Sequence, residues 1–104
     1  MKNVLFICSE NRLRSRTAET IWHPDLSVRS AGTSASAVKT VRADHMQWAD
    51  VIFVMEQHHL DKLTTLFPNL VSEKTIHILD IPDIYQYMDP ILVQILETVV
   101  PDNL

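Results

Sequence analysis

The sequence contains one cysteine, Cys8, and one glycine, Gly32. A single thiol excludes an internal disulfide and a zinc site built from several cysteines. A free thiol is typical of proteins in a reducing compartment, so we expect a cytoplasmic protein. The first apolar run, residues 4–7, is too short for the core of a secretion signal, and no stretch approaches the ~20 apolar residues of a membrane span. We therefore expect no membrane contact.

Basic residues are also scarce. Nine Lys and Arg stand against 13 Asp and Glu, which gives a formal net charge of -4. Domains that bind nucleic acids normally carry a basic surface, so we expect no nucleic-acid partner. Arg12, Arg14 and Arg16 nevertheless lie close together, and a local cationic pocket is compatible with the acidic total.

The chain has 104 residues, of which 46% are hydrophobic, and shows no repeat or linker, so we expect a single domain over residues 1–104. Short apolar runs predict strands over residues 4–7, 26–29, 51–55 and 75–79, and residues 31–34 are expected to form a loop around Gly32. Helices are predicted over residues 17–22, 37–48 and 59–66. A last helix should begin with Asp89 as its N-cap and Pro90 at its first position, and end at Pro101.

Strands that alternate with helices indicate an α/β fold, a three-layer sandwich with a four-stranded parallel sheet. Ligands of such sheets bind beyond the carboxyl ends of the strands. The loop that starts at Cys8, directly after the first strand, is therefore the expected position of a site.

The segment from Cys8 to Ser15 places an arginine, Arg14, six residues after the cysteine and at the start of a helix. Successive backbone N–H groups in such a loop form a cradle for an anion, and the helix terminus favours a thiolate. Arg14 offers two parallel donors to phosphate oxygens, and Ser15 can donate a hydrogen bond to the sulfur. The alternative interpretation is an inert core thiol beside a solvated arginine.

The sequence also resembles a known family. Its opening, Val4-Leu5-Phe6-Ile7-Cys8 with Asn11, Arg14-Ser15 and Ala18-Glu19, resembles the start of low-molecular-weight protein tyrosine phosphatases. Ser30-Ala31-Gly32-Thr33 is similar to that family's second-strand motif. Residues 49–56, followed by His59 and Leu63, are similar to its third strand and the helix after it. The resemblance implies Cys8 as nucleophile, Arg14 as phosphate ligand, and a phosphate-binding loop of Ser9, Glu10, Asn11, Arg12, Leu13 and Ser15.

Three departures from the family pattern bear on this hypothesis. Glu10 replaces a glycine of the phosphate loop, and its carboxylate would oppose an anion unless it points away. Leu13 replaces a second cysteine, so no disulfide with Cys8 can form. The stretch between Thr33 and Ala49 is shorter than in the family, which predicts a lower or rebuilt pocket rim.

The family supplies a general acid from an Asp-Pro-Tyr segment after the fourth strand. Asp83 and Tyr85 preserve the Asp-x-Tyr spacing, so Asp83 is favoured, with Asp80 as the alternative. Tyr85 and Tyr87 either wall the pocket or cover the sheet edge. His58 and His59, being adjacent, should face different directions on a helix, and we expect no metal site.

These patterns predict a cysteine-dependent phosphomonoester hydrolase that needs no metal or organic cofactor. By resemblance its substrate is phosphotyrosine in a protein, although a small phosphomonoester remains possible. Two other hypotheses stay open: an arsenate reductase that uses an external thiol, and a catalytically weak phosphate-binding or interaction module. The sequence predicts no oligomeric state.

Overall fold

The computed structural model describes residues 2–104. Four strands form one sheet: β1 (Asn3–Cys8), β2 (Ser27–Gly32), β3 (Val51–Val54) and β4 (Thr75–Ile78). Five α-helices connect or follow them, namely α1 (Arg14–Trp22), α2 (Ala43–Trp48), α3 (Gln57–Leu66), α4 (Pro68–Glu73) and α5 (Pro90–Val99), and a short 3₁₀ helix, η1 (Pro101–Asn103), ends the chain. None of these helices combines the length and apolar character that a membrane span requires.

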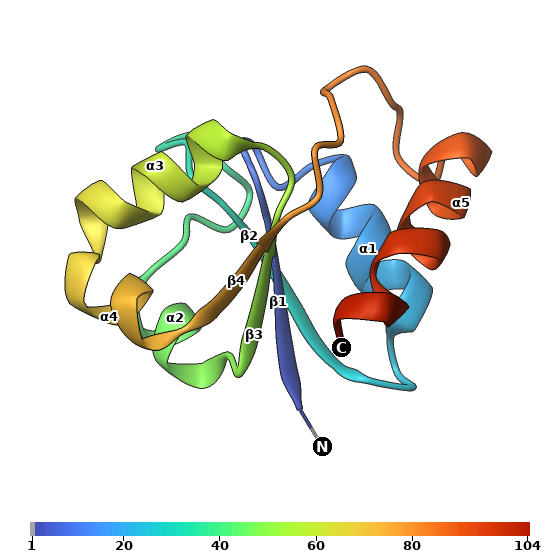
Figure 1. Ribbon diagram of the computed structural model, residues 1–104. Coiled ribbons are helices and arrows are strands. Elements are labelled where there is room, and N and C mark those ends of the chain that lie inside the picture. The colour runs from blue at the N-terminus through green and yellow to red at the C-terminus, as the bar shows by residue number, and fades with distance from the viewer. Residues whose placement is uncertain (1) are drawn as a thin grey trace.

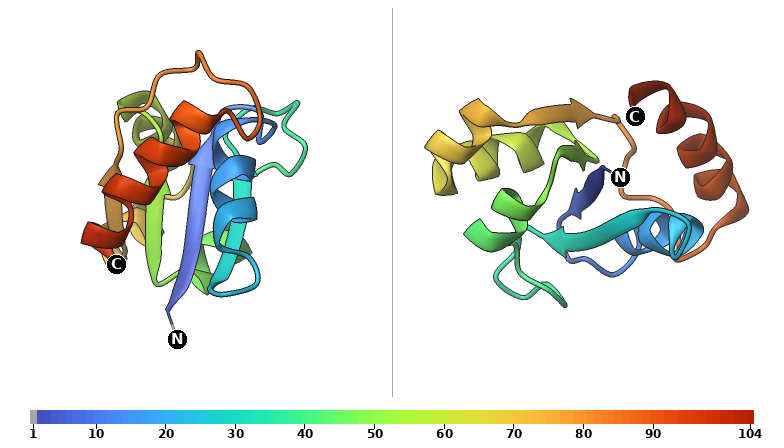
Figure 2. Two further views of the ribbon diagram at one scale, coloured as in Figure 1. Left: turned by 90° about the vertical axis from the view of Figure 1, so that its right-hand side faces the viewer. Right: turned by 90° about the horizontal axis from the view of Figure 1, so that it is seen from below.

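The sheet is parallel throughout, in the order β2-β1-β3-β4. Helices α1 and α5 cover one face and α2, α3 and α4 the other (Figure 1). The predicted three-layer α/β sandwich is therefore confirmed. The loop after β1 and the long segment between β4 and α5 lie together at the carboxyl ends of the strands (Figures 1 and 2).

The central strand β1 is buried on both faces, which explains its continuous apolar sequence. Val4, Phe6 and Cys8 point into the core under α1 and α5, whereas Leu5 and Ile7 point into the core under α2 and α3. Because side chains of a strand alternate between faces, this register places the thiol of Cys8 on the α1 side at the end of the strand.

Two predicted boundaries are wrong for a shared reason. Gly32, expected in a loop, ends β2, and the helix expected from residue 37 begins only at Ala43. The backbone of residues 33–42 forms hydrogen bonds with other segments and not within a helix. Val41 N–H donates to Gly32 O at 2.8 Å, and Val38 N–H donates to Glu10 O at 3.0 Å. These tertiary hydrogen bonds replace the helical ones, in agreement with the β-branched residues there.

A further helix, α4, was not predicted because Pro68 was expected only to end α3. Pro68 does follow α3, but it also occupies the first position of α4, where its missing N–H has no helical partner to lose. The predicted helix start at Asp89 and Pro90 is confirmed, since the Asp89 carboxylate accepts the N–H of Ile91 at 2.8 Å.

Gly32 is required by close packing and not by an unusual backbone angle. A Cβ at this position would lie 2.4 Å from the carbonyl oxygen of Ser9, 2.6 Å from the Cβ of Ala37 and 3.0 Å from the amide nitrogen of Asn11. The end of β2 therefore contacts the loop after Cys8 directly, and a side chain would push that loop away.

We predict that Gly32→Ala lowers the free energy of unfolding by roughly 1–3 kcal/mol, the usual cost of overpacking. Urea unfolding measures this change. Adding Ala37→Gly should restore only part of the loss, because the contact with the Ser9 carbonyl remains. Unchanged stability of Gly32→Ala would contradict the close approach.

Candidate active site

The loop between β1 and α1 wraps around the Cys8 thiol. Asn11 adopts φ 55°, a left-handed conformation that asparagine tolerates better than most residues, and this turn lets the loop close on itself. Leu13 precedes α1 and provides no side-chain cap, so no side chain satisfies the first N–H groups of the helix in the usual way. The loop and helix start thus present donors where an anion can lie.

The sulfur of Cys8 is buried and lies 3.0 Å from the hydroxyl oxygen of Ser15. The side-chain Nδ2 of Asn11 donates to that same hydroxyl at 2.8 Å. Because the hydroxyl accepts from Asn11, its own proton is available for a hydrogen bond to the sulfur. Ser15 therefore contacts the sulfur directly, and Asn11 orients the Ser15 hydroxyl.

Arg14 is almost fully buried, at 1% exposure, and is held from one side. Its Nη1 donates to Glu56 Oε1 at 2.5 Å and to the carbonyl of Ile81 at 2.7 Å. Its Nε has no hydrogen-bond partner within the described residues and lies 3.7 Å from Asp83 Oδ1. A buried N–H without a partner is costly, so this edge of the guanidinium is suited to an anionic ligand.

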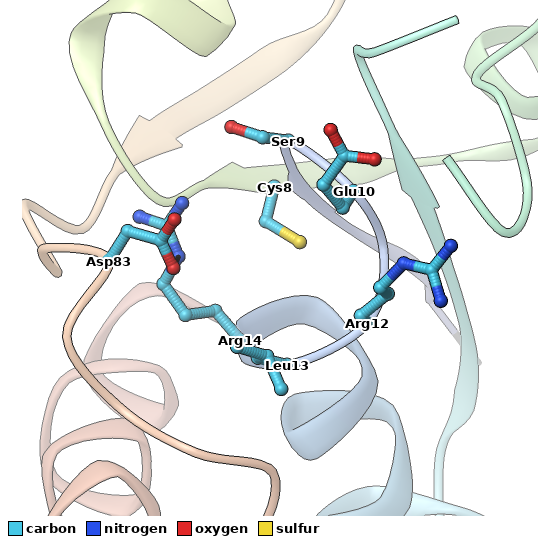
Figure 3. Close-up of a pocket in the computed structure, with 7 residues that line it drawn as sticks. All are labelled: Cys8, Ser9, Glu10, Arg12, Leu13, Arg14 and Asp83. Carbon is cyan, nitrogen blue, oxygen red and sulfur yellow. Dashed lines mark ion pairs between the residues drawn. The ribbon is translucent and has the colours of Figure 1, made fainter. Parts of the chain in front are cut away.

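These groups surround a cavity of about 90 Å³ at the carboxyl end of β1. Figure 3 shows the Cys8 sulfur at its centre, with Asp83 and Arg14 on one side and Arg12 on the other. Seven residues line it: Cys8, Ser9, Glu10, Arg12, Leu13, Arg14 and Asp83. The structure thus brings together the residues predicted for the site, with Asn11 and Ser15 in the layer behind.

Glu10 does not turn its carboxylate onto the sulfur. Its Oε2 accepts a hydrogen bond from the Ser36 hydroxyl at 2.8 Å, and its backbone oxygen accepts from Val38. The carboxylate points away from Cys8 (Figure 3). Glu10, which stands where the family has a glycine, is therefore compatible with anion binding, because its carboxylate points away from the site.

The two candidate acids occupy different surfaces. Asp83 lines the cavity of Cys8, and its side chain is 62% exposed. Asp80, with φ 56°, lies in a separate hollow lined by Glu56, His58 and other residues of that surface. Geometry therefore favours Asp83.

Neither tyrosine of this segment walls the cavity. Tyr85 packs against the core under α5, and the Tyr87 hydroxyl lies 2.8 Å from the Thr20 hydroxyl, beneath the guanidinium of Arg16. Tyr85 thus covers the core on one face of the sheet, whereas Tyr87 lies on α1 and not over the sheet edge.

Glu56 and His59 contact residues of the site, although no role was predicted for them there. Glu56 precedes α3, and hydrogen bonding to Arg14 is the main cause that holds the pKa of its carboxyl below the ordinary value. His59 Nε2 lies 2.9 Å from the Ser9 hydroxyl oxygen. Their position in the sequence could have indicated this, because both residues follow β3 and therefore lie at the same edge of the sheet as Cys8.

His58 and His59 face different directions, as expected: His58 is exposed, whereas His59 is buried and turns back to cap its own helix. Their rings are nevertheless tilted at a centroid distance of 4.1 Å, and possible metal-ligand atoms of Glu56, His58 and His59 lie within 4.8 Å of one another. These atoms already have protein partners: both ring nitrogens of His59 are bound, and the Glu56 carboxylate binds Arg14 and lies 3.3 Å from His58 Nε2.

Comparison with known proteins identifies solved structures that share this fold. No family model matches the sequence, and no curated protein matches it. Solved structures do match: the tyrosine phosphatase Wzb from Escherichia coli K30, in complex with phosphate, has a TM-score of 0.78 at 20% identity, over 98% of this chain and 96% of that one. The low-molecular-weight protein tyrosine phosphatase SP-PTP from Streptococcus pyogenes also gives 0.78, at 17% identity, over 100% and 94%.

The YwlE arginine phosphatase from Geobacillus stearothermophilus has a TM-score of 0.72 at 20% identity, over 99% of this chain and 93% of that one. The chain therefore has the fold of the low-molecular-weight protein tyrosine phosphatases. At these identities the likeness establishes the fold, and the resemblance seen in the sequence is confirmed at that level.

Burial of His59 makes stability depend on pH. Desolvation is the main cause that lowers its pKa from 6.5 to about 4. The unfolded chain therefore binds a proton near pH 6.5 that the folded chain binds only near pH 4. We predict that the free energy of unfolding falls as the pH decreases through this window and is constant, as far as this group is concerned, above it.

Urea unfolding, measured between pH 4.5 and 7.5 at intervals of about one pH unit, gives this dependence. His59→Asn should reduce the slope without abolishing it, because burial also lowers the pKa of His45. His23 is exposed, and His23→Asn is the matched control. An equal slope in the His59 variant would refute the prediction.

Proposed function

We propose that the protein is a cysteine-dependent phosphomonoester hydrolase. The observation that carries the proposal is the buried Nε edge of Arg14, which has no protein hydrogen bond and faces the cavity of the Cys8 thiol. A guanidinium anchored through Nη1, whose Nε has only the carboxylate of Asp83 near it at 3.7 Å and no hydrogen bond, is preorganised for two phosphoryl oxygens, so little rearrangement is needed on binding.

In the first step the Cys8 thiolate attacks phosphorus opposite the ester oxygen. An S–P bond forms, the P–O bond to the leaving group breaks, and Asp83 gives its proton to the departing oxygen. The loop amides of residues 9–15 and Arg14 hold the three remaining phosphoryl oxygens. Ser15, 3.0 Å from the sulfur, stabilises the thiolate before attack and after release.

In the second step water attacks the cysteinyl phosphate. The S–P bond breaks, its electron pair returns to sulfur, and the Asp83 carboxylate takes the proton of the attacking water. Inorganic phosphate leaves and the enzyme regains its starting protonation state. No metal or organic cofactor takes part in this scheme.

Phosphotyrosine in a protein is the proposed substrate, because the structurally similar proteins Wzb and SP-PTP are tyrosine phosphatases. A cytoplasmic setting fits the proposal, because a nucleophilic thiol must stay reduced. Glu10 is turned toward Ser36, so its carboxylate does not oppose an anion in the cavity.

Cys8→Ser should abolish turnover of p-nitrophenyl phosphate, because a serine hydroxyl is a far weaker nucleophile under this loop. Steady-state release of p-nitrophenol measures the effect. Glu97→Gln, an exposed change on α5, is the control that should retain activity. Persistent turnover in the serine variant would reject Cys8 as nucleophile.

Asp83→Asn should reduce the rate on phenyl phosphate by about 10²–10⁴-fold, because its leaving group needs a proton, and the rate on p-nitrophenyl phosphate by less. Asp80→Asn is the matched control on the neighbouring surface and should affect both esters equally. Comparison of kcat/KM for the two esters separates these outcomes. The reverse pattern would assign the acid to Asp80.

A further inference from the structure

The Nε edge of Arg14 lies against a carboxylate of the protein itself. Nε is buried and has no hydrogen-bond partner among residues 2–104. Asp83 Oδ1 lies 3.7 Å from it, a separation too long for a hydrogen bond and short enough for an ion pair. The edge proposed to receive a phosphoryl oxygen therefore faces an acidic side chain of the same chain.

The two partners of this contact are held with different firmness. The Arg14 side chain is 2% exposed, and its Nη1 donates to Glu56 and to the carbonyl of Ile81. The Asp83 side chain is 62% exposed and makes no hydrogen bond to the rest of the chain from residue 2 onward. An anion that reaches Nε therefore has to move Asp83, because moving Arg14 would break both hydrogen bonds of Nη1.

This contact lies inside the candidate site. Asp83 and Arg14 both line the cavity and lie together on one side of the Cys8 sulfur (Figure 3). A phosphoryl oxygen bound at Nε would lie close to the Asp83 carboxylate, and two negative groups at such a distance repel each other. Glu10, the other acid that lines the cavity, points away and accepts from Ser36. Of the two acids, Asp83 is thus the one in conflict with a bound anion.

We propose that the Asp83 carboxylate is an internal competitor of the phosphoryl group: it lies against the Nε edge of Arg14 and is displaced when a phosphoryl oxygen binds there. Displacement moves the carboxyl from the guanidinium toward the solvent side of the cavity, where the leaving group of an ester lies. The inference rests on the proposed function and deepens it, because the proposed acid also controls access to Arg14.

This competition predicts tighter anion binding when the carboxylate is removed. The observed affinity for a ligand is reduced in proportion to the fraction of molecules in which its site is accessible. Asp83→Ala should therefore bind inorganic phosphate about twofold to fivefold more tightly than the unaltered protein, since a partly exposed ion pair has about that strength. Titration calorimetry with phosphate measures the dissociation constant without turnover.

Two further variants separate competition from other effects of the substitution. Asp80→Asn removes a negative charge from the same segment but on a separate surface, and should leave the affinity for phosphate unchanged. Asp83→Asn should tighten binding as Asp83→Ala does; its amide can also donate to phosphate, whereas alanine cannot. Tightening in Asp83→Asn alone, an equal gain in Asp80→Asn, or unchanged or weaker binding by Asp83→Ala would overturn the assignment.

Catalysis should change in the opposite direction, which separates this inference from the hydrolase itself. Asp83→Asn should bind phosphate more tightly while it turns over phenyl phosphate more slowly, whereas a merely structural defect would weaken both. Tighter phosphate binding by Asp83→Ala in a protein that hydrolyses no ester would reject the hydrolase and leave the competition in place. Hydrolysis by the unaltered protein with no gain in affinity would reject the competition alone, and absence of phosphate binding in every variant would reject both.

Discussion

The buried guanidinium of Arg14 joins three segments that are far apart in the sequence. Its helix start follows the Cys8 loop, its Nη1 is bound by Glu56 after β3, and the carbonyl of Ile81 after β4 accepts from the same nitrogen. Removing one partner of a buried pair leaves an uncompensated charge and costs about 3–5 kcal/mol. The partly exposed carboxylate of Glu56 lessens that cost here, but Arg14 still links the carboxyl ends of three strands through its bonds to Glu56 and Ile81.

The loop between β1 and α1 is held from several directions by contacts with other segments. Gly32 lets β2 approach the backbone of Ser9 and Asn11, so the loop rests on the sheet. His59 contacts it from α3, and Ser36 and Val38 bind Glu10 from the segment after β2. A loop restrained in this way is organised before an anion arrives, and preorganised donors are what stabilise charge in a transition state.

The two halves of the structure contribute different groups to the cavity. The first half provides Cys8, the loop after it and Arg14, while the second half provides Asp83 on the exposed segment between β4 and α5 (Figure 1). That segment is anchored by Ile81 in the core and by Met88, whose N–H donates to Thr17 at 2.9 Å. The proposed acid is therefore carried by a span fixed at both ends and exposed between them, where a substrate can reach it.

The sequence alone determined the features that depend on local pattern. Continuous apolar runs identified the strands, Asp89 and Pro90 identified the start of α5, and the spacing from Cys8 to Arg14 identified the loop of the site. It could not place Gly32 in β2 or end the helix predicted from residue 37, because hydrogen bonds between separate segments decide both. Only the tertiary structure showed that Glu56 and His59 meet Arg14 and Ser9, since proximity between side chains more than 40 residues apart depends on how strands align in the sheet.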